Sequence, residues 1–143
     1  MKILVSACLL GVPCRYDGKS KPCEAVLRLQ ERHELIPVCP EVMGGLPTPR
    51  IPSECQRDGR VVNRAGVDVT AEYQAGAAAV LEIAKTSGCE VAILKERSPA
   101  CGKGLIYDGS FSKTLIQGNG VCAACLMENG IRVLGESELE QPI

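Results

Sequence analysis

The sequence predicts an α/β fold in which helices cover a mostly parallel sheet. Short apolar segments typical of buried strands recur along the chain, and segments with helical character separate them. Strands that alternate with helices in this way form parallel sheets with right-handed crossovers. Such sheets bind ligands beyond the carboxyl ends of their strands, so the residues that follow each strand are the first candidates for a site.

The first part of the chain supplies two strands and one helix. Lys2–Ala7 is a continuous apolar run, as expected of a buried parallel strand. Pro22 suits the first turn of a helix, and Cys23–His33 contains helix-forming residues. Leu35–Cys39 is the second predicted strand, and its internal Pro37 favours a position at a strand end.

The clearest helix lies in the middle of the chain. Asp68–Ser87 carries an apolar stripe at helical spacing, with Asp68 or Thr70 as its cap and Gly88 at its end. A third strand is predicted over Cys89–Lys95. A short helix begins at Asn119 or Gly120 and stops at Gly130, and a last strand follows over Ile131–Leu134.

Two connections do not fit this alternation. Pro40–Val67 is long and rich in proline, which in a compact domain indicates a functional or a disordered segment. Within it, Gln56–Val62 contains an Asp-Gly turn signal, and Leu105–Ile116 contains another at Asp108-Gly109. Both segments predict small hairpin insertions.

Length and composition limit the function. The 143 residues predict one domain over 1–143. A net charge of −1 predicts no long nucleic acid and no anionic membrane as partner, and 3% aromatic residues argue against a base-stacking platform. The apolar piece Ile3–Val5 is too short for a signal peptide, so we expect a cytoplasmic protein. We also expect either a monomer or a homodimer.

Cysteine is the most informative residue type. Nine cysteines in a chain expected to stay reduced indicate metal ligation, catalysis or core packing rather than disulfides. Cys8 and Cys39 end the first two predicted strands, and Cys101 follows the third. The carboxyl ends of parallel strands lie along one edge of a sheet, so these thiols are predicted to meet in one cleft. Cys14 is close enough in sequence to join them.

The other cysteines have less specific surroundings. Cys23, Cys55 and Cys89 are expected to pack as small hydrophobes. Cys122-x-x-Cys125 has the spacing of a redox dithiol or of half a zinc site, but its short apolar helix and the absence of a second pair favour packing. Thiolates in a chain with one histidine favour an iron–sulfur or Cu(I) centre, and buried free thiols are the alternative.

Five motifs follow one another along the sequence and cover nearly the whole chain: SACLLGVPCRYDG, PVCPEVMGGLPTPR, DVTAEYQAGA, LKERSPACG and GNGVCAACLMENGI. Together they resemble the small family of uncharacterised domains that includes the thiouracil desulfidases. The resemblance implies a Rossmann-like three-layer sandwich with a mostly parallel sheet and small hairpin insertions. It implies a [4Fe–4S] cluster on three cysteines, with Cys8, Cys39 and Cys101 at the matching positions, and Cys14 as a possible further ligand.

The same resemblance implies an enzyme that removes sulfur from a thiolated nucleobase such as 2-thiouracil. Glu41 and Ser98 match the positions regarded as catalytic. The hypothesis is a non-redox C–S cleavage that releases hydrogen sulfide, in which an open iron polarises the thiocarbonyl group and Glu41 acts as base or acid. Ser98 would hydrogen-bond the substrate or the attacking water. A solvated or turn-capping Glu41 and a purely structural Ser98 are the alternatives.

Substrate binding is predicted for Gly44, Gly45 and Arg50. The two glycines either let backbone N–H groups approach the cluster or the substrate, or they only form a tight turn. Arg50, like Arg15 and Lys95, either places positive charge near an anionic cluster or is a plain surface charge.

Two other functions remain open from the sequence. A non-catalytic iron–sulfur electron or sulfur carrier is favoured if Cys14 is a fourth ligand. A metal-free thiol module built on Cys122 and Cys125 predicts thiol–disulfide exchange that survives the loss of iron.

Overall fold

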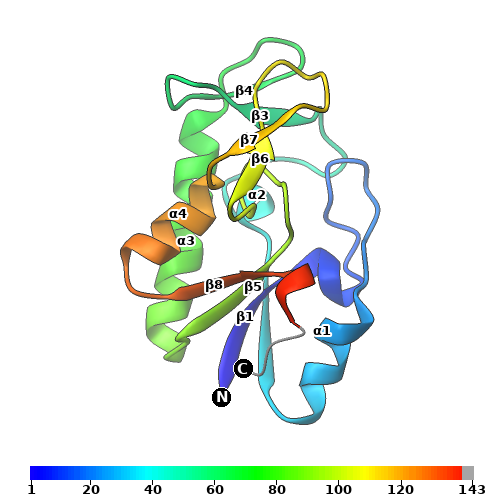
Figure 1. The fold of residues 1–143 in the computed structure, drawn as a ribbon, viewed down its shortest axis with the longest axis vertical. Helices are drawn as coiled ribbons and strands as arrows, with labels where there is room; N and C mark the ends of the chain where they lie inside the picture. The colour runs from blue at the N-terminus through cyan, green and yellow to red at the C-terminus, as the bar shows by residue number, and fades with distance from the viewer. Residues whose placement is uncertain (140–143) are drawn as a thin grey trace.

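Four parallel strands form the central sheet of the computed structural model, which describes residues 1–139 and leaves residues 140–143 of the predicted domain outside the description. The sheet has the order β2-β1-β5-β8, and each neighbouring pair is parallel. Figure 1 shows the sheet near the chain termini and the insertions at the opposite end of the molecule. The strands are β1 (Lys2–Ser6), β2 (Glu34–Val38), β5 (Val91–Leu94) and β8 (Arg132–Gly135). The predicted α/β fold is confirmed.

Helices cover both faces of this sheet, which makes the three predicted layers. Leu4 and Ala92 pack against α3 (Thr70–Ser87) and α4 (Val121–Glu128) in one hydrophobic core. Successive side chains of a strand point to opposite faces. The neighbouring residues of the same strands therefore form a second core with Val26 of α1 (Glu24–Arg28) and with the 3₁₀ segment η1 (Ala7–Leu10).

The predicted elements lie close to the observed ones. The predicted helix over Cys23–His33 is α1, which continues as the 3₁₀ segment η2 (Leu29–Glu31). Pro37 lies in β2 at the edge of the sheet, where a missing N–H is tolerated. A last 3₁₀ segment, η3 (Glu136–Glu138), follows β8. Among the described residues, no helix has the length and apolar character that a membrane crossing requires.

Both predicted hairpins are present. β3 (Ser53–Cys55) pairs with β4 (Val61–Asn63), and β6 (Leu105–Tyr107) pairs with β7 (Leu115–Gln117), each pair antiparallel. The sequence prediction missed α2, a helix of four residues over Pro40–Met43. A single helical turn is too short to show a periodic pattern, although a proline at the first helical position is a common start.

Two glycines allow α2 to pack unusually close to α3. A Cβ atom on Gly76 of α3 would lie 1.9 Å from the carbonyl oxygen of Pro40, and one on Gly44 would lie 1.9 Å from the carbonyl oxygen of Glu72. Only a residue without Cβ permits such a backbone approach. This packing fixes the short helix, and the residues at its start, against the longest helix of the fold.

Candidate active site

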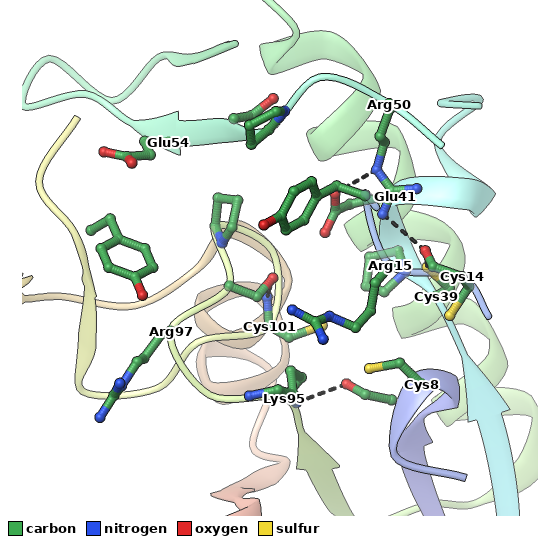
Figure 2. A pocket seen from close by; sticks show the side chains of 18 of the residues that line it. Cys8, Cys14, Arg15, Cys39, Glu41, Arg50, Glu54, Lys95, Arg97 and Cys101 are labelled. Atoms are coloured by element: carbon green, nitrogen blue, oxygen red, sulfur yellow. Dashed lines mark hydrogen bonds and ion pairs between the residues drawn. The ribbon is translucent and has the colours of Figure 1, made fainter. Parts of the chain in front are cut away.

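A cleft of about 620 Å³ opens beyond the carboxyl ends of the parallel strands. The segments after β1, β2 and β5 line it, and the two hairpins contribute its remaining wall. Figure 2 shows Cys8, Cys14 and Cys39 on one side of this cleft and Glu54 of β3 on the other. The cleft lies where an open α/β sheet normally binds its ligand.

The structure brings the four candidate thiols together in this cleft, as the strand-end positions predict. Cys8 lies in η1 directly after β1, Cys39 is the cap of α2 directly after β2, and Cys101 follows β5. Cys14 also lines the cleft, and its carbonyl oxygen is 3.8 Å from the Cys39 sulfur. Residues as far apart in the sequence as Cys8 and Cys101 thus line the same cleft.

Burial and mutual proximity perturb these thiols. Burial raises the pKa of Cys101 well above its usual value, and the neighbouring Cys122 adds to the effect. The hydrogen bond with Cys14, followed by burial, raises the pKa of Cys39. For Cys8 a hydrogen bond from Cys14 lowers the pKa, against the opposing effect of burial. Cys39 and Cys101 are therefore neutral thiols in the free protein, and metal binding must displace their protons.

The donor set fits an iron–sulfur cluster better than a single metal ion. Within residues 1–139, no three side chains of His, Cys, Asp or Glu converge closely enough to hold one ion. The single histidine, His33, lies next to the N-terminal amine, at the opposite end of the strands. In a [4Fe–4S] cluster each cysteine binds a different iron, so its thiolates surround a wider volume. Thiols distributed around a cleft match that requirement.

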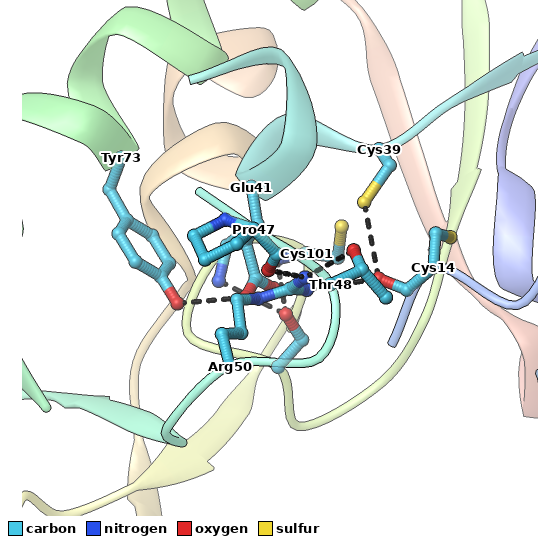
Figure 3. A network of polar contacts seen from close by, with 10 residues as sticks. Cys14, Cys39, Glu41, Pro47, Thr48, Arg50, Tyr73 and Cys101 are labelled. Atoms are coloured by element: carbon cyan, nitrogen blue, oxygen red, sulfur yellow. Dashed lines mark hydrogen bonds and ion pairs between the residues drawn. The ribbon is translucent and has the colours of Figure 1, made fainter. Parts of the chain in front are cut away.

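Glu41, in the first turn of α2, is held in place by two donors. The guanidinium Nε of Arg50 and the hydroxyl of Tyr73 both donate to Oε2 of Glu41, each at 2.9 Å. Figure 3 shows these contacts converging on the carboxylate from two directions. Among the described residues, Oε1 accepts no hydrogen bond, and Glu41 lines the cleft. The carboxylate therefore has one anchored and one available oxygen.

Arg50 connects several segments of the site. Nη1 donates to the carbonyl of Pro47 and to the hydroxyl of Thr48, each at 3.1 Å, and Nη2 donates to the carbonyl of Cys14 at 3.0 Å. With Nε on Glu41, every nitrogen of the guanidinium has a partner within the protein, and the side chain is 6% exposed. The predicted binding of substrate by Arg50 finds no support in these contacts, which give it an orienting role.

Ser98 holds the turn that carries Cys101. Its Oγ accepts the backbone N–H groups of Ala100 and Cys101, each at 3.1 Å. This is the structural role that a Ser-Pro turn predicts. Ser98 also lines the cleft, and its hydroxyl proton is still available to a ligand there. The structural and the catalytic interpretations are thus compatible.

Gly44 and Gly45 lie outside the lining of the cleft. The N–H of Gly44 donates to the carbonyl of Pro40, and that of Gly45 donates to the carbonyl of Val42. Gly45 has a φ of 98°, which only glycine adopts readily. Their observed roles are close helix packing and a turn, so the prediction that they bind substrate has no support in this geometry.

The cleft is positively charged although the chain is not. Its lining contains seven lysines and arginines and three glutamates, whereas the whole chain has a net charge of −1. Lys95 is paired with Glu136 of η3 at 2.8 Å. Figure 2 shows Arg15 extending between Lys95 and Glu41 into the cleft. The net charge of the whole chain does not reveal this local excess of positive charge, which favours the binding of an anionic cluster or ligand.

The aromatic residues are also concentrated here. The chain has three tyrosines and one phenylalanine, and Tyr16, Tyr73, Tyr107 and Phe111 all line the cleft. The low aromatic content argues against a base-stacking platform, but composition does not show that these four rings gather at one cleft. Tyr73 lies on the core-facing side of α3, and no sequence signal identifies its hydroxyl as a partner of Glu41.

The Cys122-x-x-Cys125 pair has the properties of packed thiols. Cys122 is fully buried in α4, and burial, with a further effect of Cys125, raises its pKa to about 12. A redox dithiol requires a lowered thiol pKa and exposure. Burial likewise raises the pKa of Cys55 to about 11, and all the cysteines are free thiols. Cys89 is buried and Cys23 is half-buried, as expected for small hydrophobes.

Fold and site define an α/β protein with a cysteine-lined cleft at the carboxyl edge of a parallel sheet. Residues 3–138 match the model of the 2-thiouracil desulfurase family, and the chain belongs to this family. It is 42% identical over 146 aligned residues to the uncharacterized protein YbbK of Bacillus subtilis (strain 168), covering 96% of this chain and 97% of YbbK. A solved structure of the [4Fe–4S]-dependent thiouracil desulfidase TudS is similar, with a TM-score of 0.88, 46% identity, and coverage of 97% and 93% of the two chains.

Proposed function

We propose that this protein is a [4Fe–4S]-dependent desulfidase that removes sulfur from a thiolated nucleobase of the 2-thiouracil type and releases hydrogen sulfide. The observation that carries the proposal is one cleft that contains both a set of buried or half-buried strand-end thiols and a carboxylate with one oxygen available to a ligand. The family and the TudS similarity support the reaction type.

Cys8, Cys39 and Cys101 are the proposed ligands of the cluster. They come from the ends of three neighbouring strands, and their thiols influence one another's ionisation. When bound, the cluster would supply a soft Lewis acid that polarises a thiocarbonyl group. Three protein ligands leave one position open, which is the mark of a catalytic rather than a structural metal site.

Glu41 is the proposed general base. Its Oε1 takes a proton from a water that attacks the ring carbon, and Oε2 stays bonded to Arg50 and Tyr73. The attacking oxygen forms the C=O bond as the C–S bond breaks. The sulfur leaves as hydrosulfide with the second proton of the water, and the proton held at Glu41 then gives hydrogen sulfide. Substrate and water thus give a carbonyl product and hydrogen sulfide, with no net electron transfer.

The remaining cleft residues support this hydrolytic step. The hydroxyl of Ser98, oriented by the N–H groups of Ala100 and Cys101, donates a hydrogen bond to the substrate or the water. Lys95 and Arg15 place positive charge next to the thiols, where negative charge accumulates as sulfur leaves. The positive charge of these two side chains therefore stabilises the transition state rather than the bound substrate.

The test is an anaerobic sulfide-release assay on reconstituted protein with a panel of thiolated pyrimidine bases, nucleosides and nucleotides. The expected result is sulfide and the matching carbonyl product in equal amounts from at least one compound. Cys39→Ala should lose iron, whereas Cys125→Ala, on the outer part of α4, should retain it. The ligand set is wrong if Cys39→Ala keeps its full iron content.

Cys14 gives a specific reason to test a second function, a non-catalytic iron–sulfur carrier. It lies beside Cys8 and Cys39 in the same cleft, so a fourth thiolate is within reach. An electron carrier normally fills all its metal positions with cysteine. Reconstituted Cys14→Ser should hold the wild-type amount of iron if the desulfidase proposal is right, and should lose iron if Cys14 is a ligand.

A further inference from the structure

The hydroxyl of Tyr73 is a buried group whose observed partner is the proposed catalytic base. We propose that Tyr73 is a positioning residue that fixes the plane of the Glu41 carboxylate and presents its Oε1 to the cleft. This inference rests on the proposed function and adds to it a residue from α3, a helix that supplies none of the proposed ligands.

The packing of α3 explains how this contact forms. Tyr73 is 1% exposed, and it lies one turn before Gly76, where the backbone of α2 approaches the helix most closely. Tyr73 packs in the hydrophobic core and also lines the cleft. A phenylalanine would fill the same core, so the hydroxyl has no packing function of its own.

The two anchors act together on one oxygen. Arg50 approaches Glu41 from the loop after α2, Tyr73 approaches from α3, and both distances are 2.9 Å. The last torsion of a glutamate side chain is soft, so a single donor leaves the carboxylate free to tilt. Donors from two separate elements fix the plane, and a catalytic group must be held this closely to be effective.

The hydroxyl also keeps its proton under working conditions. Burial raises the pKa of Tyr73 above its usual value, and the negative charge of Glu41 raises it further. Tyr73 is therefore a donor throughout the neutral pH range, and it does not compete with Glu41 as a base. An ionised carboxylate receives stronger hydrogen bonds than a neutral one.

The experiment compares Tyr73→Phe with Glu41→Gln and with the double variant, all reconstituted anaerobically. Tyr73→Phe should lower kcat about tenfold, with KM within about twofold and iron content unchanged, because one hydrogen bond to a charged group is lost. In the Glu41→Gln background the same change should cost nothing more, because its effect passes through Glu41. Val80→Ala, a buried change elsewhere on α3, should lower the melting temperature but leave kcat unchanged.

Wild-type kcat in Tyr73→Phe, or a fully additive loss in the double variant, would overturn the inference. A readout without turnover separates it from the proposed function. The carboxylate stretch of Glu41, assigned by infrared difference against Glu41→Gln, should shift in Tyr73→Phe even if no substrate in the panel is turned over. An unchanged stretch would overturn the positioning role, whereas an absence of sulfide release by the wild type would overturn the proposed function alone.

Discussion

Gly76 provides the sharpest test of how the fold builds the site. A Cβ at this position would lie 1.9 Å from the carbonyl oxygen of Pro40, the first residue of α2. The nearest approach that real Cβ atoms tolerate is 3.0 Å, so α2 must move by about 1 Å or more in Gly76→Ala. That movement carries Cys39 and Glu41, which flank Pro40, out of position.

The magnitude follows from two opposing effects. Overpacking costs about 1–3 kcal/mol or more, whereas replacing a helical glycine by alanine gains about 0.5–1 kcal/mol. A net loss of about 1–2 kcal/mol corresponds to a fall in melting temperature of roughly 3–7 °C for a chain of this size. A displacement of about 1 Å at a catalytic group costs about a hundredfold in rate.

The assay measures melting temperature, iron content and sulfide release of Gly76→Ala beside Ala78→Gly. Ala78 is exposed on the same helix, so its change reports helix propensity without moving α2. We expect Ala78→Gly to lose some stability and to keep its activity, and Gly76→Ala to lose both. Wild-type activity in Gly76→Ala would refute the claim that the contact between α2 and α3 positions the site.

Three further predictions concern the surroundings of the cleft. Arg50→Lys should lower kcat about tenfold and destabilise the protein by about 1–3 kcal/mol, because lysine cannot bridge Glu41 and the carbonyl of Cys14. Steady-state turnover measures the first effect, and chemical unfolding measures the second. Raised pKa values of about 11 and about 12 mean that Cys55 and Cys122 are neutral below pH 10, so alkylation, followed by peptide mapping, should be slow at pH 8 and accelerate as pH rises. Removal of the cluster with a chelator should lower the melting temperature, because a ligand that binds only the native state stabilises it; equal melting temperatures would argue against a tightly bound cluster.

The parts of this structure that could be predicted from sequence are those governed by local patterns. Apolar runs identified the parallel strands, Asp-Gly pairs identified both hairpins, and Gly88 marked the end of α3 with a φ of 73°. The cysteines that follow the strands were predicted to share one cleft, and they do. This prediction needs no side-chain detail, because the topology of a parallel sheet places the carboxyl ends of its strands along one edge.

The parts that could not be predicted depend on contacts between distant segments. Tyr73 has the sequence pattern of a core residue, and only the approach of α2 turns its hydroxyl toward Glu41. Arg50 has the sequence context of a ligand-binding cation, yet all its nitrogens bond within the protein, Nε to Glu41 of α2 and the two Nη atoms to loop residues. Gly44 fits either a tight turn or a turn that exposes backbone N–H groups in the sequence, which gives no sign of its close packing against the backbone of Glu72. None of these contacts leaves a periodic or spacing signal.

Sulfide release by the anaerobically reconstituted protein is the most direct test of the proposed desulfidase activity. The assay follows hydrogen sulfide and the desulfurated pyrimidine together, with wild type and Glu41→Gln at matched iron content. We predict equal amounts of the two products from the wild type, and full iron content with only a small residual turnover in Glu41→Gln. A fully reconstituted wild type that releases no sulfide from any thiolated base, nucleoside or nucleotide would contradict the proposal.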